Sequence, residues 1–366
     1  MGAERELDRR CFLAGAAAAG VALATGCASV RPAATAVRAA AVRTARVPRK
    51  LSDAIRGQVL ERGTPGFLSA AHVYNERYDA VLPRAVARPV DAADVRAAVR
   101  WALAHDVPLR ARSGGHSYAG YSTLAGGVVL DLRHLRAIEV DRRARTATIG
   151  AGAQLIDVYT ALAGHGATIP AGSCPSVGIA GHALGGGMGL AGRAFGLTTD
   201  NLIAATLVTA DGGLHEVDDR ADPELLWALR GGGGGNFGVV TGLRLHARPL
   251  PARASYFFVS WPWSSASDAI AAWQSWAPHA RDELTSIFHL ETGGGTPVVS
   301  VSGQYLGPAR ALGRLLAPLR AVAGASISVG DQDYRGLQLR WAGCLHTGLA
   351  ACHTAGTRPG GMLARA

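Results

Sequence analysis

The stretch that most constrains this chain is residues 171–192, AGSCPSVGIAGHALGGGMGLAG, which place one cysteine, Cys174, just ahead of a glycine-dense loop. Glycine loses more conformational entropy on folding than any other residue, so such a run indicates that the backbone must approach something closely. We expect a large polyanionic ligand to lie along this loop, with the Cys174 thiol at its mouth. The glycines are Gly178, Gly181, Gly185, Gly186, Gly187, Gly189 and Gly192.

Composition predicts a globular protein with a large core, because 48% of the 366 residues are hydrophobic and only 17% are charged. The length suits roughly two domains. The formal net charge is +10, but residues 1–50 alone hold nine basic and three acidic residues. The basic balance therefore belongs mostly to the N-terminal arm, and we predict no nucleic-acid partner.

The N-terminal arm reads as an export signal. Arg9 and Arg10 form a twin-arginine pair, followed by an apolar run from residue 13 to about residue 24 that is too short to span a bilayer. Cleavage is expected after residues 34–36, while Cys27 ends a sequence similar to a bacterial lipoprotein box. We expect no transmembrane segment, and either secretion or a lipid anchor at Cys27 on the outer face of the cytoplasmic membrane.

Export by this route carries folded proteins, often with a cofactor already inserted, which points to redox chemistry. Of the five cysteines, Cys11 and Cys27 lie in the signal region. Cys344 and Cys352 are near neighbours, and whether they form a disulfide outside the cell stays open. Cys174 is then left without a partner, which suggests a special use.

A second candidate lies where a predicted β-α-β unit over residues 79–113 ends. Asp91 is expected to cap its helix, and residues 107–111 form its second strand. The chain then reads RSGGHSYAG over residues 112–120. A buried strand followed by a glycine pair places the next side chain, His116, at a sheet edge where ligands commonly bind.

A dinucleotide-binding reading of the glycine loop is disfavoured. Residues 187–192, GMGLAG, satisfy the G-x-G-x-x-G pattern, and Asp211 lies about twenty residues further on. That motif should open a long helix, whereas polar residues 198–201 follow here. Asp211 also falls in a predicted hairpin turn.

Two other site chemistries are weighed and disfavoured. A nucleophilic pair of Cys174 with His116 or His182 accounts for the thiol but leaves both large glycine tracts, within 171–192 and at 231–235, unexplained. A zinc site lacks paired ligand spacing, so no metal is predicted.

Four stretches together resemble the FAD-linked oxidases of the vanillyl-alcohol oxidase superfamily, which carry a PCMH-type FAD-binding domain. They are residues 112–118, 171–189, 200–201 and 234–240. The berberine-bridge-enzyme-like branch, which includes bacterial carbohydrate and antibiotic-tailoring oxidases, is the most similar, over about residues 60–365. The resemblance implies a bicovalent FAD, with His116 bonded to the flavin 8α-methyl carbon and Cys174 to ring carbon 6.

The resemblance also assigns the surrounding residues to the cofactor. Attachment needs a neutral imidazole and a thiolate, and the thiolate is favoured by a lowered pKa. Backbone N–H groups of the glycine loop are expected at the pyrophosphate. The cofactor-binding residues so implied are Arg112, Ser113, Gly114, Gly115, His116, Ser117, Cys174, Ser176, Gly178, Gly181, His182, Gly187, Gly189, Asn236, Phe237, Gly238 and Val239.

The fold class implied is α+β: a two-subdomain PCMH-type FAD-binding domain, then an antiparallel-sheet substrate domain covered by helices. We expect a signal peptide and start of a tether over 1–36, a linker over 37–58, the FAD-binding domain over 59–250 and a truncated substrate domain over 251–366. Relatives continue for about a hundred residues more, in a segment that carries their Tyr or Glu general base. No catalytic base is therefore assigned.

The function implied is an exported FAD-dependent oxidase. It would oxidise an alcohol, sugar or related small molecule by hydride transfer to flavin N5, with O₂ reduced to H₂O₂. The alternative is a flavin-binding remnant without turnover, because the C-terminal catalytic segment is absent.

Overall fold

The computed structural model describes residues 49–292, 295–347 and 349–354. All of them belong to one unit of the chain, Arg46–Ala366. The twin-arginine pair, the cleavage site at 34–36 and Cys27 lie outside the described residues. Within the described part, no helix combines the length and apolar character needed to cross a membrane.

The first sheet contains the expected β-α-β unit. Its strand order is β1-β2-β4-β3, with β2, β4 and β3 parallel and β1 antiparallel to β2. Asp91 caps the connecting helix α3 as predicted, since its Oδ1 accepts the Asp94 N–H at 3.0 Å. The elements are η1 (Leu51–Asp53), β1 (Gln58–Glu61), α2 (Phe67–Ala71), η2 (Glu76–Tyr78), β2 (Ala85–Arg88), α3 (Ala92–Ala104), β3 (Leu109–Arg112) and β4 (Val128–Asp131).

The folded core begins before the end of the expected linker over 37–58. Leu51 and Ile55 are both buried and join the main hydrophobic core. The burial of two large apolar side chains favours order over a flexible tether.

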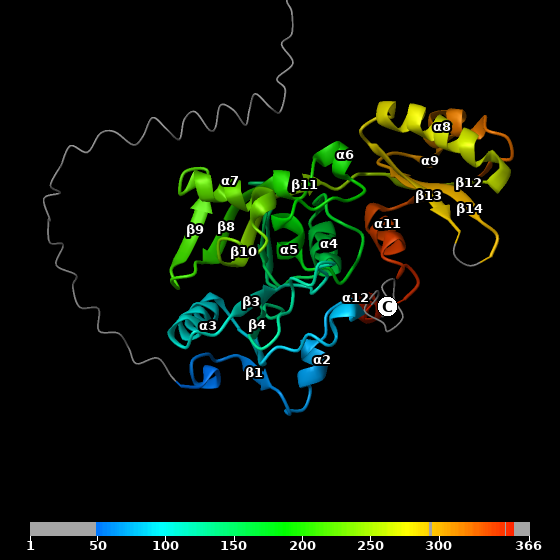
Figure 1. The fold of residues 1–366 in the computed structure, drawn as a ribbon. Coiled ribbons are helices and arrows are strands. Elements are labelled where there is room, and N and C mark those ends of the chain that lie inside the picture. The colour runs from blue at the N-terminus through cyan, green and yellow to red at the C-terminus, as the bar shows by residue number, and fades with distance from the viewer. Residues whose placement is uncertain (1–48, 293–294, 348, 355–366) are drawn as a thin grey trace, which may run out of the picture. The chain divides into compact units, whose positions relative to one another are not determined.

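The second sheet is antiparallel, in the order β5-β6-β10-β8-β9, and the expected hairpins β5–β6 and β8–β9 are present. Helices α4, α5 and α7 accompany it (Figure 1). The glycine stretch 171–192, expected as a loop, contains the short helix α5. The elements are β5 (Ile138–Asp141), β6 (Thr146–Gly150), α4 (Leu155–Gly164), β7 (Ala167–Thr168), α5 (Ile179–Leu184), α6 (Gly192–Phe195), η3 (Thr199–Asn201), β8 (Leu202–Val208), β9 (Leu214–Asp218), α7 (Pro223–Gly232), β10 (Val239–His246) and β11 (Arg248–Pro249).

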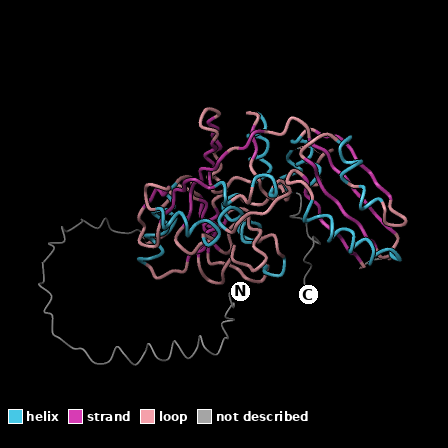
Figure 2. Tube along the Cα trace, turned by 90° about the horizontal axis from the view of Figure 1, so that it is seen from above, coloured by secondary structure: helices cyan, strands magenta, loops and turns pink. Residues whose placement is uncertain are grey.

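The third sheet is also antiparallel, in the order β13-β14-β12-β15, and has its own core around Phe257 and Val301. Helices α8 and α9 lie along it, as Figures 1 and 2 show. Alternation along β12 buries Phe257 and Val259 on the helix side, while Phe258 on the other face contacts Trp341. The elements are β12 (Ala254–Trp261), η4 (Trp263–Ser265), α8 (Ala266–Trp276), η5 (Ala277–His279), β13 (Leu284–Glu291), β14 (Val298–Tyr305), α9 (Ala309–Leu315), α10 (Ala317–Arg320) and β15 (Ser326–Gln332).

Two last helices, α11 (Tyr334–Trp341) and α12 (Leu349–Thr354), return the chain to α4. Cys344 and Cys352 form a disulfide, which answers the question that the sequence left open. Both cysteines pack on Ile156 of α4. The α+β class is thereby confirmed, with antiparallel sheets and covering helices.

Candidate flavin site

His116 lies in the loop that follows β3, between two other segments of the chain. Its Nε2 is 3.0 Å from the Ser176 hydroxyl oxygen, and its ring stacks on Tyr74 with centroids 4.1 Å apart and 17° between the planes. Burial lowers the pKa of His116 to about 4, because the charged form loses its hydration. The imidazole is therefore neutral near pH 7, as attachment requires.

Cys174 lies in the glycine stretch and is exposed, with its thiol unpaired. The peptide groups around Gly172, two residues earlier, are held by a Tyr159 hydroxyl bond to the Gly172 carbonyl and a Gly172 N–H bond to His182 Nε2, each 3.0 Å long. Partial desolvation raises the pKa of the Cys174 thiol. This is opposite to the lowered pKa expected from sequence, because the shift has no cationic contribution to oppose desolvation.

The loops of His116 and Cys174 pack backbone against backbone. A Cβ on Gly114 would lie 2.1 Å from the Gly178 nitrogen, and one on Gly178 would lie 2.0 Å from the Ser113 hydroxyl oxygen. Neither position has room for a larger residue. These two glycines therefore serve the contact between the loops.

Other glycines of the stretch, taken together with Gly234 of the tract 231–235, divide into two groups. A Cβ on Gly189 would lie 1.9 Å from the Ala171 carbonyl oxygen and one on Gly187 would lie 2.5 Å from the Thr198 hydroxyl, so both are needed for packing within the protein. Gly181 and Gly234 have no heavy atom within 4 Å of such a Cβ. These open positions face the space where a ligand could approach the backbone.

That space is a pocket of about 1010 Å³. It is at the upper end of typical small-molecule pockets, about 300–1,000 Å³, which suits a ligand as large as a dinucleotide. Both predicted anchors, His116 and Cys174, lie on its wall. The predicted site residues on the wall are Ser113, Gly114, Gly115, His116, Ser117, Cys174, Gly178, Gly181, His182, Asn236, Phe237, Gly238 and Val239.

The second glycine tract reaches this wall from the end of α7. The Asn236 side-chain amide donates to the Gly232 carbonyl at 2.7 Å, which closes the turn before β10. Gly238 allows close approach, since a Cβ there would lie 2.3 Å from the Val208 carbonyl oxygen. The tract therefore forms a hydrogen-bonded, closely packed turn between α7 and β10.

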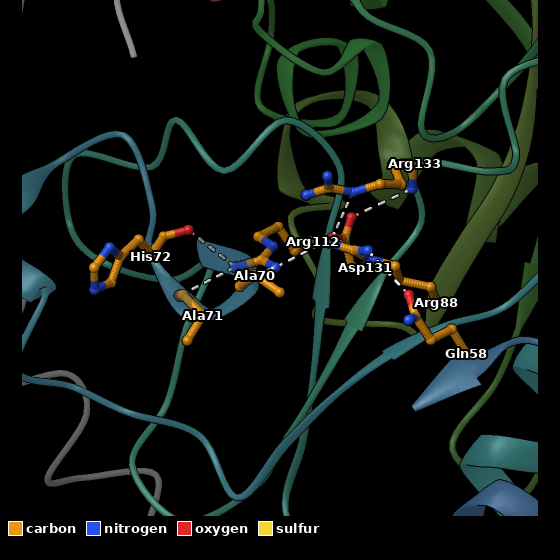
Figure 3. A network of polar contacts seen from close by, with 8 residues as sticks. All are labelled: Gln58, Ala70, Ala71, His72, Arg88, Arg112, Asp131 and Arg133. Carbon is orange, nitrogen blue, oxygen red and sulfur yellow. Dashed lines mark hydrogen bonds and ion pairs between the residues drawn. The ribbon is translucent and has the colours of Figure 1, made fainter. Parts of the chain in front are cut away.

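Four predicted site residues, Arg112, Ser176, Gly187 and Gly189, are not on the pocket wall. Arg112 is buried beneath the His116 loop, where its guanidinium donates to the carbonyls of Ala70, Ala71 and His72 at the end of α2. Figure 3 shows these hydrogen bonds. Ser176 is buried too, and its hydroxyl contacts His116.

Arg112 belongs to a larger buried network centred on Asp131, the last residue of β4 (Figure 3). The Asp131 carboxylate lies 3.2 Å from Arg112, 2.7 Å from Arg133 and 3.5 Å from Arg88. All three guanidinium groups contact Oδ2 of the fully buried carboxylate and compensate its charge, while Oδ1 accepts the Arg133 backbone N–H at 3.4 Å. The network ties β3, β4 and α2 together under the His116 loop.

Sequence reasoning missed Tyr74 and the contact that Ser176 makes. Tyr74 also donates its backbone N–H to the Gly115 carbonyl at 3.1 Å. It lies 42 residues before His116, and no spacing rule links an aromatic residue at that distance to a loop histidine. In the described residues, no group of three or more His, Cys, Asp or Glu side chains is placed to hold a metal ion.

Comparison with known proteins identifies the class as FAD-binding proteins. The family of FAD binding domains matches residues 83–218. An uncharacterised FAD-linked oxidoreductase of Bacillus subtilis is 37% identical over 272 residues, which are 72% of this chain and 59% of that protein. The chain thus spans about three fifths of the length of this curated relative.

Two solved structures extend the comparison. The wild-type berberine-bridge-enzyme-like protein 1 of Physcomitrella patens has a TM-score of 0.78 and 30% identity, over 85% of this chain and 67% of that one. The glucooligosaccharide oxidase of Acremonium strictum, whose FAD is described as 6-S-cysteinyl and 8α-N1-histidyl, has a TM-score of 0.72 and 30% identity, over 79% and 61%. This chain belongs to the berberine-bridge-enzyme-like family of FAD-linked oxidases.

Proposed function

We propose that this protein is an exported oxidase that holds FAD through two covalent bonds, at His116 and Cys174. The observation that carries the proposal is that both side chains lie on the wall of one pocket whose glycines leave the backbone open. The described doubly attached FAD of the Acremonium strictum oxidase supports the same pair of bond types.

The residues divide the work of holding the cofactor. The neutral His116 ring offers a nitrogen lone pair, while Cys174 offers a thiol that must first lose its proton. Gly181 and Gly234 let the backbone N–H groups approach the phosphates. The FAD held by these residues would supply the redox chemistry, namely hydride acceptance at N5 from an alcohol or sugar and transfer of two electrons to O₂ to give H₂O₂.

Acid precipitation of the purified, flavin-loaded protein tests the attachment. A yellow pellet is expected for the parent, His116→Ala and Cys174→Ala, and a colourless pellet for the double variant. Tyr121→Phe, a change on the same pocket wall, should keep both bonds and serves as the control. A colourless pellet from loaded parent protein would contradict covalent attachment.

Oxygen uptake with a panel of sugars and alcohols tests turnover separately. Peroxide formed in equal amount to the oxygen consumed supports an oxidase. Bound flavin without uptake of oxygen for any donor favours the alternative of a flavin-binding protein without turnover.

Export is tested by replacing Arg9 and Arg10 with lysine, which should keep the protein in the cytoplasm if the twin-arginine route is used.

A further inference from the structure

Helix α11 lies between α4 and the face of the third sheet that α8 and α9 leave open (Figure 1). At its end, Leu339 and Ala342 pack on Ile156 of α4. Arg340 and Trp341 instead contact side chains of the sheet. Because α4 belongs to the region that matches the FAD binding domain, α11 connects that region to the predicted substrate domain.

Arg340 is held in place without a counter-ion. Its guanidinium carbon lies 3.8 Å from the centroid of the Tyr256 ring, a cation–π contact that fixes its plane. Among the described residues its side chain has no ion pair and no hydrogen bond, and its Nε is buried without an acceptor. An arginine whose donors are fixed but unused is suited to a planar anion, because the guanidinium fork matches a carboxylate.

Gln304 supplies a second unused donor beside the same ring. Tyr256 and Gln304 are opposite each other in the register of β12 and β14, so their side chains share one face of the sheet. The Trp341 indole N–H donates to Gln304 Oε1 at 3.1 Å, which fixes the amide orientation because an indole nitrogen only donates. Gln304 is fully buried, and its Nε2 finds no acceptor in the described part of the chain. Since buried donors normally have partners, the two unused donors favour a ligand that accepts hydrogen bonds.

The surface next to these donors is aromatic. The ring centroids of Tyr256 and Phe258 are 6.0 Å apart, and those of Phe258 and Trp341 are 5.9 Å apart. Phe258 is 41% exposed, so a ring-shaped ligand can pack on it. Aromatic surface with a few convergent polar groups is typical of small-molecule sites. The combination suits a cyclic molecule that carries an acidic group.

We propose that Arg340 and Gln304 form a carboxylate-binding site, and that the substrate is a sugar or cyclic alcohol that bears a carboxylate. The carboxylate accepts hydrogen bonds from the Arg340 guanidinium and the Gln304 amide, while the ring packs against Phe258. A neutral analogue leaves both donors without an acceptor, so the site selects against it. This inference rests on the proposed function and adds the substrate class.

The first test measures binding to the full-length, flavin-loaded protein by calorimetry without O₂, with D-glucuronate and D-glucose as probes. Glucuronate should bind at least about tenfold more tightly, the effect of a charge-assisted hydrogen bond. Arg340→Gln should abolish this preference. Arg335→Gln removes the same charge from an exposed position of α11 and should keep it. Equal binding of the two sugars by the parent, or an unchanged preference in Arg340→Gln, would overturn the proposal.

Inorganic phosphate separates a carboxylate site from a general anion site. Phosphate has no ring to pack on Phe258, so it should bind about tenfold more weakly than glucuronate. Phosphate that binds as tightly as glucuronate, with the same dependence on Arg340, would overturn the carboxylate assignment.

Gln304→Glu provides a second test, because it supplies a carboxylate beside Arg340 from within the protein. The new side chain can still accept the Trp341 indole N–H, and its charge should pair with Arg340 and block the site. The preference for glucuronate should vanish while the thermal midpoint stays close to that of the parent. Adding Arg340→Gln removes the partner of this carboxylate and should lower the midpoint by about 5–10 °C. An equally large drop for Gln304→Glu alone would show that Arg340 does not face Gln304 and would overturn the site.

Calorimetry and oxygen uptake separate this inference from the proposed function. Arg340-dependent binding of glucuronate without oxygen uptake for any donor would support the carboxylate site and contradict the oxidase. Oxygen uptake that is equally efficient with glucose and glucuronate would support the oxidase and overturn the inference.

Discussion

The two proposed anchors are prepared to different degrees. His116 is stacked, hydrogen-bonded and held neutral by a pKa of about 4, over a buried ionic network. Cys174 is exposed and unpaired, and its pKa is raised. A nucleophile that is already in its reactive form needs no change of charge to attack, whereas a protonated thiol does.

From this difference we predict that, of the two proposed bonds, the histidyl bond forms first. Formation of the cysteinyl bond should depend more on the bound flavin itself.

The supports behind the two loops differ in the same way. Beneath the His116 loop lies the carboxylate of Asp131 with three arginines. Behind the Cys174 loop lies α4, whose Leu155 and Ile156 N–H groups donate to the carbonyls of Val177 and Pro175.

The largest expected effect comes from removing the centre of the ionic network. Asp131→Ala leaves buried arginines without their counter-ion and should cost about 3–5 kcal/mol in the free energy of unfolding. Urea denaturation measures it. Arg133→Ala is the matched control, since its half-exposed side chain should contribute about 1 kcal/mol or less. Equal losses of unfolding free energy in the two variants would show that the Asp131 network does not support the His116 loop more strongly than the Cys174 loop is supported.

The contact between the two loops can be broken at Gly178. Gly178→Ala places a methyl group 2.0 Å from the Ser113 hydroxyl oxygen, so the free energy of unfolding should fall by about 1–3 kcal/mol. Gly181→Ala, where a Cβ meets open space, should leave the stability of the flavin-free protein unchanged or raise it by up to about 1 kcal/mol. Thermal unfolding of both variants gives the comparison, and a stable Gly178→Ala protein would contradict the close packing.

The pH dependence of attachment distinguishes the anchors directly. In Cys174→Ala protein the rate at His116 should change little between about pH 6 and about pH 8, because a pKa of about 4 keeps the ring neutral throughout. In His116→Ala protein the rate at Cys174 should rise about tenfold per pH unit below the thiol pKa, with the thiolate fraction. Acid-stable flavin fluorescence against time measures both rates. If the two attachment rates changed with pH in the same way, the proposed difference between His116 and Cys174 would be wrong.

The smallest effect on stability is expected for the contact between α12 and α4, the helix behind the Cys174 loop. His353 Nε2 lies 2.7 Å from Asp157 Oδ1 on α4, and both side chains are about one third exposed. His353→Ala should therefore cost about 0.2–1 kcal/mol in the free energy of unfolding and leave attachment at Cys174 unchanged. His165→Ala, at the exposed end of the same helix, is the control. A large loss of Cys174 attachment would mean that α12 supports that loop strongly.

Local patterns were sufficient for much of the fold. Alternation and capping predicted the β2-α3-β3 unit with Asp91 as its cap, and the turn at Asp211 predicted the β8–β9 hairpin. The short helix α5 was missed, because glycine-rich sequence is a poor predictor of helix and tertiary packing overrides the propensity. The burial of Leu51 and Ile55 was missed for a related reason: their partners lie far along the chain.

The sequence by itself determined the family, the FAD-binding class and the two residues, His116 and Cys174, that face one pocket. It did so because their motifs are local strings whose residue types carry the chemistry. The roles of Arg112 and Ser176, the stacking of Tyr74 and the directions of the pKa shifts were decided by the tertiary structure alone. Desolvation and contacts between segments depend on three-dimensional proximity, which no single stretch of sequence contains.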